Sequence, residues 1–167
     1  MTTPPRAYVG MGSNLGDRAG NLLLAVRAMA EAGLTVARLS PVYETEPAGV
    51  LEEQPVFLNM VAELAEPLPP PEALLRLLLD IERALGRERP RPQAPRTLDL
   101  DLLLYGEKII ETEALTLPHP RIHLRRFVLA PLAALTPEAR HPMLNTTFAQ
   151  LLDATPDRPY VRLWRPE

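Results

Sequence analysis

The stretch Thr97-Leu98-Asp99-Leu100-Asp101-Leu102-Leu103-Leu104-Tyr105 is the most regular segment of the chain. Successive side chains of a β-strand point to opposite faces. The alternation predicts one apolar face that packs under helices and consists of Leu98, Leu100, Leu102 and Leu104. Asp99 and Asp101 then lie together on the opposite face of the same strand.

Two carboxylates on one strand face repel each other unless a positive charge lies between them. Magnesium takes oxygen ligands, and it commonly uses one or two carboxylates together with substrate phosphates. We therefore interpret Asp99 and Asp101 as metal ligands. The alternative is an ordinary strand face in contact with water, but the flanking leucines favour the metal interpretation.

The segments around this strand predict an α+β fold. Strands are expected at 7–12, 34–39 with a continuation past Pro41 to Thr45, 57–65 and 98–105, and helices at 17–32 and 70–85. The order is therefore βαββαβ, which indicates a mainly antiparallel sheet with helices over one face. Further helical segments are expected at 125–135, broken or kinked at Pro131, and at 147–152, followed by a closing strand at 160–164. We find no repeat or linker, so one domain is expected over residues 1–167.

Composition excludes several classes of protein. The formal net charge of −3 argues against a broad nucleic-acid interface, and the absence of cysteine excludes disulfides and thiolate metal sites. The first residues, MTTPPR, are no secretory signal, and no apolar run has the length of a membrane span. We expect a cytoplasmic protein that binds neither nucleic acid nor a membrane.

A basic, proline-rich loop leads directly into the aspartate strand. Residues 86–96 carry Arg87, Arg89, Arg91 and Arg96 in an otherwise acidic protein. Arginine binds phosphate through a planar fork of donors, so arginines beside paired aspartates are typical of a nucleotide–magnesium site. An exposed, proline-stiffened loop is the alternative.

A second basic cluster occupies residues 118–127, PHPRIHLRRF. His119 and His123 have the spacing of zinc ligands on a helix, but prolines on both sides of His119 argue against a helix there. We favour phosphate contacts from His119 and Arg125, with an ordinary basic surface as the alternative.

Two other patterns favour structural roles on the sequence alone. Gly10, Gly12 and Gly16 resemble a dinucleotide-binding fingerprint, but the third glycine falls one residue late. Ser13, Asn14 and Asp17 are more simply turn and helix-start residues. An aromatic residue beside an amide, as at Phe57 and Asn59, can hold a flat heterocycle. More often the aromatic residue of such a pair is part of the hydrophobic core, and the amide is hydrogen-bonded within the protein.

Together these segments closely resemble the 6-hydroxymethyl-7,8-dihydropterin pyrophosphokinase family of folate biosynthesis. The matching motifs agree in order and spacing across nearly the whole chain. They are GSNLGD at 12–17, SPVYETEP at 40–47, FLNMV at 57–61, PRTLDLDLLLYG at 95–106 and LPHPRIHLRRFVLAPL at 117–132.

The resemblance implies a ferredoxin-like α+β fold and an ATP-dependent diphosphotransferase. Such enzymes transfer diphosphate from ATP to the hydroxymethyl group of 6-hydroxymethyl-7,8-dihydropterin and release AMP, with two Mg²⁺ ions bound to ATP. ATP and the pterin are thus the expected partners of a monomer.

The resemblance also implies a set of site residues. The implied metal ligands are Asp99 and Asp101. The implied catalytic residues are Arg87, Arg96 and Asp101. ATP-binding positions are Glu82, Arg96, Leu102, Thr116, His119 and Arg125; pterin-binding positions are Thr45, Glu46, Ala48, Phe57, Asn59 and Phe127. The loop 87–95 corresponds to a mobile lid in the family.

The sequence departs from the family pattern in the lid, where Gln93 stands near the position of a usual tryptophan, and at Glu46 and Pro120. Two other functions stay open at this point. One is a different magnesium-dependent phosphotransferase or nucleotidyltransferase, and the other is a ferredoxin-like module that binds nucleotides or RNA.

Overall fold

The computed structural model describes residues 3–47, 53–86, 97–157 and 159–166. Six strands form the main sheet in the order β5-β1-β4-β3-β8, with β2 also paired to β4. All of the pairings within it are antiparallel. The strands are β1 (Ala7–Ser13), β2 (Thr35–Leu39), β3 (Tyr43–Thr45), β4 (Phe57–Ala65), β5 (Asp99–Tyr105) and β8 (Val161–Leu163).

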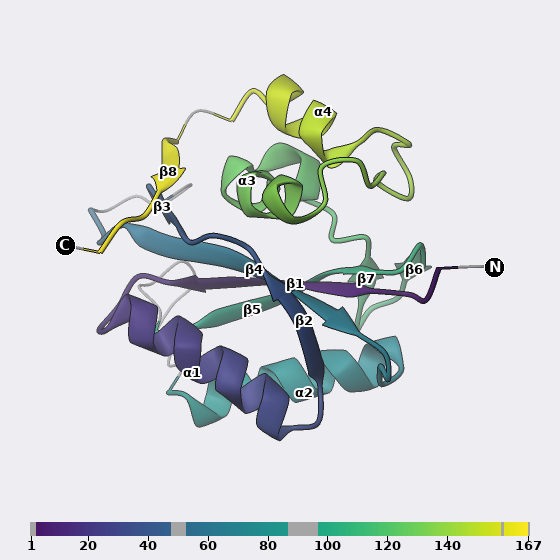
Figure 1. Cartoon of the computed structure of the whole chain (residues 1–167), viewed down its shortest axis with the longest axis horizontal. Coiled ribbons are helices and arrows are strands. Elements are labelled where there is room, and N and C mark those ends of the chain that lie inside the picture. The colour runs from purple at the N-terminus through teal and green to yellow at the C-terminus, as the bar shows by residue number, and fades with distance from the viewer. Residues whose placement is uncertain (1–2, 48–52, 87–96, 158, 167) are drawn as a thin grey trace.

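Helices cover both faces of this sheet (Figure 1). The helices α1 (Arg18–Glu31) and α2 (Pro71–Ala84) lie on one face, and α3 (Arg126–Leu135) and α4 (Phe148–Ala154) lie on the other. The sequence predicted the βαββαβ order and helices over one face. The C-terminal helices cover the second face because it also presents apolar side chains, among them Val61 and Leu103.

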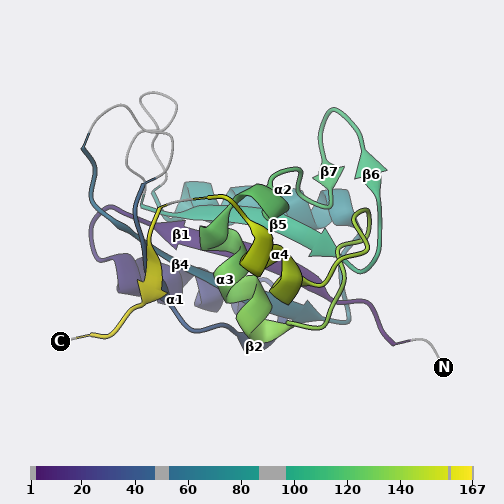
Figure 2. The same cartoon turned by 90° about the horizontal axis from the view of Figure 1, so that it is seen from above.

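A short hairpin and a helical turn complete the described elements. The hairpin strands β6 (Ile110–Glu111) and β7 (Thr116–Leu117) pair with each other, and the 3₁₀ turn η1 (Ile122–Leu124) precedes α3. Seen from above, α3 and α4 lie across the sheet and the hairpin projects at one side (Figure 2).

The segment after α1 divides into two strands rather than one. Pro41 interrupts it, and β2 and β3 pair with successive parts of β4: Leu39 lies opposite Ala62, and Tyr43 lies opposite Asn59. Between them the Ser40 hydroxyl accepts a hydrogen bond of 2.8 Å from the Val61 N–H. The expected continuation to Thr45 is therefore present with a break, since proline donates no ladder hydrogen bond.

The aspartate strand forms where the alternation predicts it, with one correction. Leu98, Leu100 and Leu102 are buried against α1 and α2 as expected, but Leu104 belongs to the core cluster on the α3 face. The register between β1 and β5 shifts after Tyr8, which pairs with Leu104 while Val9 pairs with Leu102. An extra residue in one strand changes the face of those that follow, so the prediction for Leu104 was wrong.

Helix boundaries follow local chemistry. The Asp17 carboxylate accepts a hydrogen bond of 3.0 Å from the Gly20 N–H at the start of α1, and Thr147 and Gln150 form a capping box on α4. Pro131 lies inside α3 without ending it. In the ranges described, none of the helices has the length and apolarity that a membrane span requires.

Candidate functional site

The paired aspartates lie on β5, at one edge of the main sheet, next to two glycines of the neighbouring strand β1. Asp99 and Asp101 are opposite Gly12 and Gly10 of β1, respectively. Both carboxylates line a cavity of about 150 Å³ on the α3 face of the sheet, together with Asn59 from β4. The expectation that they share the face opposite the leucines is therefore confirmed.

This first cavity has walls from several parts of the chain. β4 supplies Phe57 and Asn59, the end of β3 supplies Thr45 and Glu46, and the start of α3 supplies Phe127. Its full lining is Gly10, Met11, Gly12, Thr45, Glu46, Gln54, Phe57, Asn59, Met60, Val61, Asp99, Asp101, Arg125, Phe127 and Val128. The motifs at 40–47, 57–61 and 117–132 thus meet in one place.

The amide of Asn59 is held in a fixed position on the cavity wall. Asn59 Nδ2 donates a hydrogen bond of 2.7 Å to Thr45 Oγ1, and both residues are buried. A Cβ at Gly12 would lie only 2.6 Å from Asn59 Oδ1, so glycine is needed there to make room for the amide. A fixed amide with a donor and an acceptor suits a ligand edge that carries both kinds of polar atom.

Two phenylalanines from different elements line the same cavity as this amide. Phe57 begins β4, and Phe127 lies in the first turn of α3. The guanidinium carbon of Arg125 lies 5.4 Å from the centroid of the Phe127 ring, a cation–π arrangement that keeps a positive charge beside Asp99 and Asp101. Flat apolar rings beside a fixed amide suit an aromatic heterocycle.

Residues 54–56, just before β4, are hydrogen-bonded to side chains that follow β1 and begin α1. Asn14 Nδ2 donates hydrogen bonds of 3.2 Å to Gln54 Oε1 and to the Pro55 carbonyl, and Arg18 donates one of 2.9 Å to the Val56 carbonyl. Gln54 is part of the cavity lining. The motif at 12–17 therefore positions a cavity wall.

A second cavity, of about 350 Å³, lies along the outer edge of β5. Its lining comes from α2, β5 and the segment 114–120, and consists of Leu75, Leu79, Glu82, Leu100, Asp101, Leu102, Ala114, Leu115, Thr116, His119 and Pro120. Glu82 is buried and accepts a hydrogen bond of 2.6 Å from the Leu100 N–H. Asp101 lines both cavities, so the two spaces meet at this carboxylate.

His119 brings an imidazole next to that junction. Burial lowers the pKa of His119, the negative charge of Asp101 opposes this, and the positive charges of Arg125 and Arg121 lower the pKa further. The Arg121 N–H donates a hydrogen bond of 3.2 Å to His119 Nδ1. Nδ1 is thus an acceptor, which leaves Nε2 as the N–H donor of the neutral ring.

The predicted residues divide into three groups. Thr45, Glu46, Phe57, Asn59 and Phe127, the described positions of the expected pterin site, meet in the first cavity. Glu82, Leu102, Thr116 and His119 meet in the second cavity, whereas Arg125, assigned to the same ligand, lines the first. Ala48, Arg87, Arg96 and the lid at 87–95 lie outside the described residues.

Sequence reasoning missed several lining residues. Gly10 and Gly12 lie within β1, as the strand expected at 7–12 predicted, but they were not assigned to a site, and Gln54 and Val128 were not considered. The available signal was the alternation of glycines, because glycine inside a strand often marks the close approach of another group. The apolar residues Leu75 and Leu79 of the second cavity carried no signal beyond the helical stripe.

Comparisons with known proteins identify the family of this chain. Residues 8–137 match a family model described as 7,8-dihydro-6-hydroxymethylpterin-pyrophosphokinase (HPPK). The chain is 43% identical over 160 residues to the 2-amino-4-hydroxy-6-hydroxymethyldihydropteridine pyrophosphokinase of Bacillus subtilis, covering 95% of this chain and 90% of that protein. It is 38% identical over 150 residues to the folic acid synthesis protein fol1 of Pneumocystis carinii, covering 90% of this chain but 20% of that protein.

A solved structure gives the same fold. An HPPK-DHPS crystal structure in complex with substrates is similar with a TM-score of 0.73 and 13% identity, over 92% of this chain and 43% of that chain. The chain therefore spans less than half of that protein and about a fifth of the fungal relative, but nearly all of the Bacillus protein.

Proposed function

This chain belongs to the 7,8-dihydro-6-hydroxymethylpterin-pyrophosphokinase family, and from that premise we propose how its two cavities carry out one reaction. The enzyme transfers diphosphate from ATP to the hydroxymethyl group of 6-hydroxymethyl-7,8-dihydropterin, a step of folate biosynthesis, and releases AMP. The observation that carries the assignment of cavities is that Asp101 lines both of them. One catalytic domain over residues 1–167 is part of the proposal, and the monomeric state and cytoplasmic location stay predictions.

In this proposal the pterin occupies the first cavity. Phe57 and Phe127 contact the faces of its ring, and the Asn59 amide, fixed by Thr45, hydrogen bonds to the ring edge. The hydroxymethyl group then points toward Asp99 and Asp101, where the cavity continues to the junction. Aromatic contact supplies affinity and the amide supplies orientation.

ATP occupies the second cavity, with its phosphates toward the junction. Leu75 and Leu79 offer apolar surface, while Thr116 and His119 offer polar atoms on the opposite side. Arg125, which lines the first cavity, lies where it neutralises charge on the transferred diphosphate rather than near the base. We keep Arg87 and Arg96 as phosphate-binding residues on the family resemblance alone.

Asp99 and Asp101 suit a magnesium ion. They are adjacent on one strand face, neither is fully buried, and both open onto the cavity. Among the described residues no group of three or more His, Cys, Asp or Glu side chains could hold a metal ion. Two carboxylates therefore fit an ion that completes its shell with phosphate oxygens and water. We propose the two ions implied by the resemblance. When bound, magnesium neutralises the charge of the phosphates and orients them.

The transfer itself is a displacement at phosphorus. The hydroxymethyl oxygen attacks the β-phosphorus of ATP, the bond from that phosphorus to the bridging oxygen of AMP breaks, and the hydroxyl proton is released. The chain's contribution is to hold the two reactants in line and to exclude water from them. Asp101 lies between the cavities, where it is placed to accept the hydroxyl proton.

Product analysis tests this function against other phosphotransferases. The protein is incubated with Mg²⁺, the pterin and ATP that carries ¹⁸O only in the non-bridging oxygens of its β- and γ-phosphate groups. We expect AMP without label, and a pterin product that carries both labelled phosphates. Formation of ADP with a singly phosphorylated pterin, or of nucleotidyl-pterin with free diphosphate, would assign the site to a different reaction.

A further inference from the structure

The C-terminal part of the chain contacts two walls of the first cavity, the start of α3 and the end of β3. It lies after residue 137, where the match to the family model ends. We propose that Asp157 and residues 159–164, here called the C-terminal strap, position the start of α3 and the end of β3 for pterin binding. The proposal rests on the proposed function, because it assigns a role toward the pterin of that reaction.

The first attachment is at the start of α3. Asp157 Oδ2 accepts a hydrogen bond of 2.9 Å from the N–H of Arg126, the first residue of that helix. The N-cap residue Arg125 makes no side-chain cap of its own. A carboxylate there satisfies a free N–H and interacts favourably with the positive end of the helix dipole. Arg125 and Phe127, on either side of this contact, both line the cavity.

The second attachment is at the end of β3. The Tyr160 N–H donates a hydrogen bond of 2.7 Å to Glu46 Oε1, and the Tyr160 carbonyl accepts one of 3.4 Å from the Glu46 N–H. β8 continues this pairing, with Val161 opposite Thr45. Thr45 in turn accepts the hydrogen bond that fixes Asn59. The strap therefore contacts the backbone of the residues that hold the pterin-reading amide.

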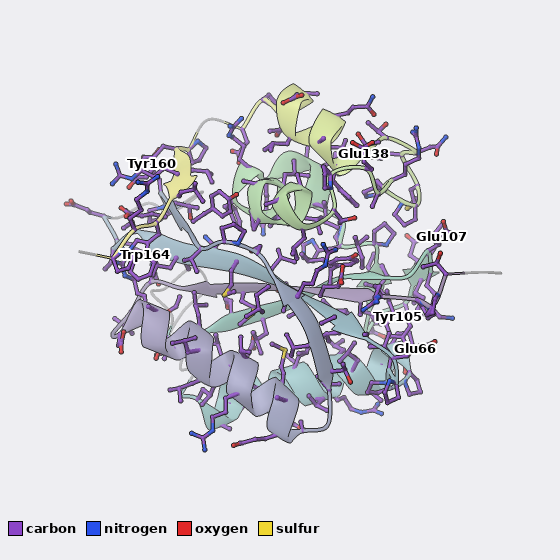
Figure 3. The ribbon with its side chains drawn as sticks, in the orientation of Figure 1. Glu66, Tyr105, Glu107, Glu138, Tyr160 and Trp164 are labelled. Atoms are coloured by element: carbon purple, nitrogen blue, oxygen red, sulfur yellow. The ribbon has the colours of Figure 1, made fainter. Side chains whose placement is uncertain are left out.

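β3 depends on this pairing because it is short. It contains three residues and pairs with β4 on one side and β8 on the other. Without β8 it would be an edge strand held by β4 alone. The Trp164 N–H donates a hydrogen bond of 2.9 Å to the Val42 carbonyl, and its ring packs against the core below the sheet. Figure 3 shows Tyr160 and Trp164 at the same end of the molecule.

The second cavity does not share these contacts. Its lining comes from α2, β5 and residues 114–120, and includes no residue of the strap, β3 or α3. Loss of a strap contact is therefore expected to weaken binding of the pterin much more than binding of ATP, which meets the strapped elements only through Arg125. A variant that is partly unfolded would bind both the pterin and ATP more weakly. The ratio of the two affinities therefore distinguishes a loss of positioning from a loss of stability.

The test uses the full-length chain with Asp157→Ala and Tyr160→Pro, which remove the two attachments independently. Binding of ATP with an α,β-methylene bridge is measured first by calorimetry with Mg²⁺; this analogue lacks the bond that the reaction breaks. The pterin is then titrated into protein saturated with the analogue. We expect the pterin Kd to rise about tenfold in each variant and the analogue Kd to change less than about twofold. In steady-state assays KM for the pterin rises while kcat is largely kept.

Two matched control variants change the same side chains but keep the hydrogen bonds. Asp157→Asn keeps an acceptor oxygen and Tyr160→Phe keeps the N–H, so both should bind the pterin nearly as tightly as the unaltered protein. Unchanged pterin affinity in Asp157→Ala and Tyr160→Pro, or equal loss for both ligands, would overturn the strap proposal. If the unaltered protein binds the analogue but not the pterin, the proposed function fails, and the role of the strap fails with it.

Discussion

Gly12 leaves open the space into which the Asn59 amide projects. The sequence could indicate Phe57, Asn59 and Thr45 as a heterocycle site only through a resemblance, since an aromatic residue beside an amide is more often part of a core. It could indicate Gly12 as a glycine inside a strand, but not Asn59 as its neighbour, because the two strands that bring positions 12 and 59 together are distant in the chain. The structure pairs these two residues directly across β1 and β4.

Substitution Gly12→Ala tests the importance of that space. The new Cβ would lie 2.6 Å from Asn59 Oδ1, and Asn59 cannot move without losing its hydrogen bond to Thr45. We expect KM for the pterin to rise about tenfold or more, with KM for ATP nearly unchanged.

Gly10→Ala is the matched comparison on the same face of β1. Its Cβ would be 3.3 Å from a methyl group of Leu103, which can shift by a few tenths of an ångström. Steady-state kinetics of both variants test whether the effect depends on the Asn59 amide, and we expect a smaller increase in KM for the pterin in Gly10→Ala. Equal increases in the two variants would show that the effect is not specific to this amide.

Strands and helices were more predictable than single contacts. The sequence predicted both strands, 57–65 and 98–105, and the alternation in 98–105 predicted the face of most of its residues, since period two is a local property. The assignment of Leu104 failed because the register shift depends on how β5 pairs with β1. The break between β2 and β3 was visible as Pro41, but only the structure shows that both strands share β4.

Three strands are joined by one buried carboxylate, at the end of the sheet that carries Tyr8. Glu63 of β4 accepts a hydrogen bond of 2.7 Å from the Tyr8 hydroxyl and two, of 3.0 and 2.7 Å, from Arg38 of β2. The hydrogen bonds from Arg38 lower the pKa of Glu63 below its ordinary value of 4.5, although burial opposes them. Burial and the neighbouring carboxylate raise the pKa of Tyr8 to about 12, so Tyr8 remains a donor at neutral pH.

This arrangement predicts acid-sensitive stability. Because the folded pKa of Glu63 is below its unfolded value, the unfolded chain binds the proton more readily, and the stabilisation is present above pH 4.5 and lost as pH falls through the folded pKa. Glu63→Gln should lower the free energy of unfolding by about 2 kcal/mol at pH 7. The difference from the unaltered protein should shrink as pH falls below about 4.

Urea unfolding at pH 7 and at acidic pH measures both effects. Glu31→Gln is a suitable control, because Glu31 pairs with Arg27 on the exposed surface of α1. That variant should differ little from the unaltered protein at either pH. A Glu63→Gln difference that stayed constant with pH would rule out the titration of this carboxyl as its cause.

The molecule as a whole places two cavities on either side of one carboxylate. Asp101 separates a space lined by aromatic and amide groups from a space lined by α2 and the β6–β7 hairpin. The sequence predicted the carboxylate pair from alternation alone, but it could not predict the junction, because the two spaces form only when α2, α3 and the hairpin pack around β5. Tertiary packing thus provides the arrangement that makes a transfer between two bound molecules feasible.

The rate of AMP formation in Asp99→Asn tests the central claim most directly. The substitution keeps the size of the side chain but removes the negative charge. It is compared with the unaltered protein and with Asp80→Asn, a change at an exposed aspartate of α2, in the presence of ATP, Mg²⁺ and the pterin. We expect AMP formation to fall at least about 100-fold in Asp99→Asn and to be unchanged in Asp80→Asn. Equal AMP formation by all three proteins would contradict a metal-binding role for this carboxylate.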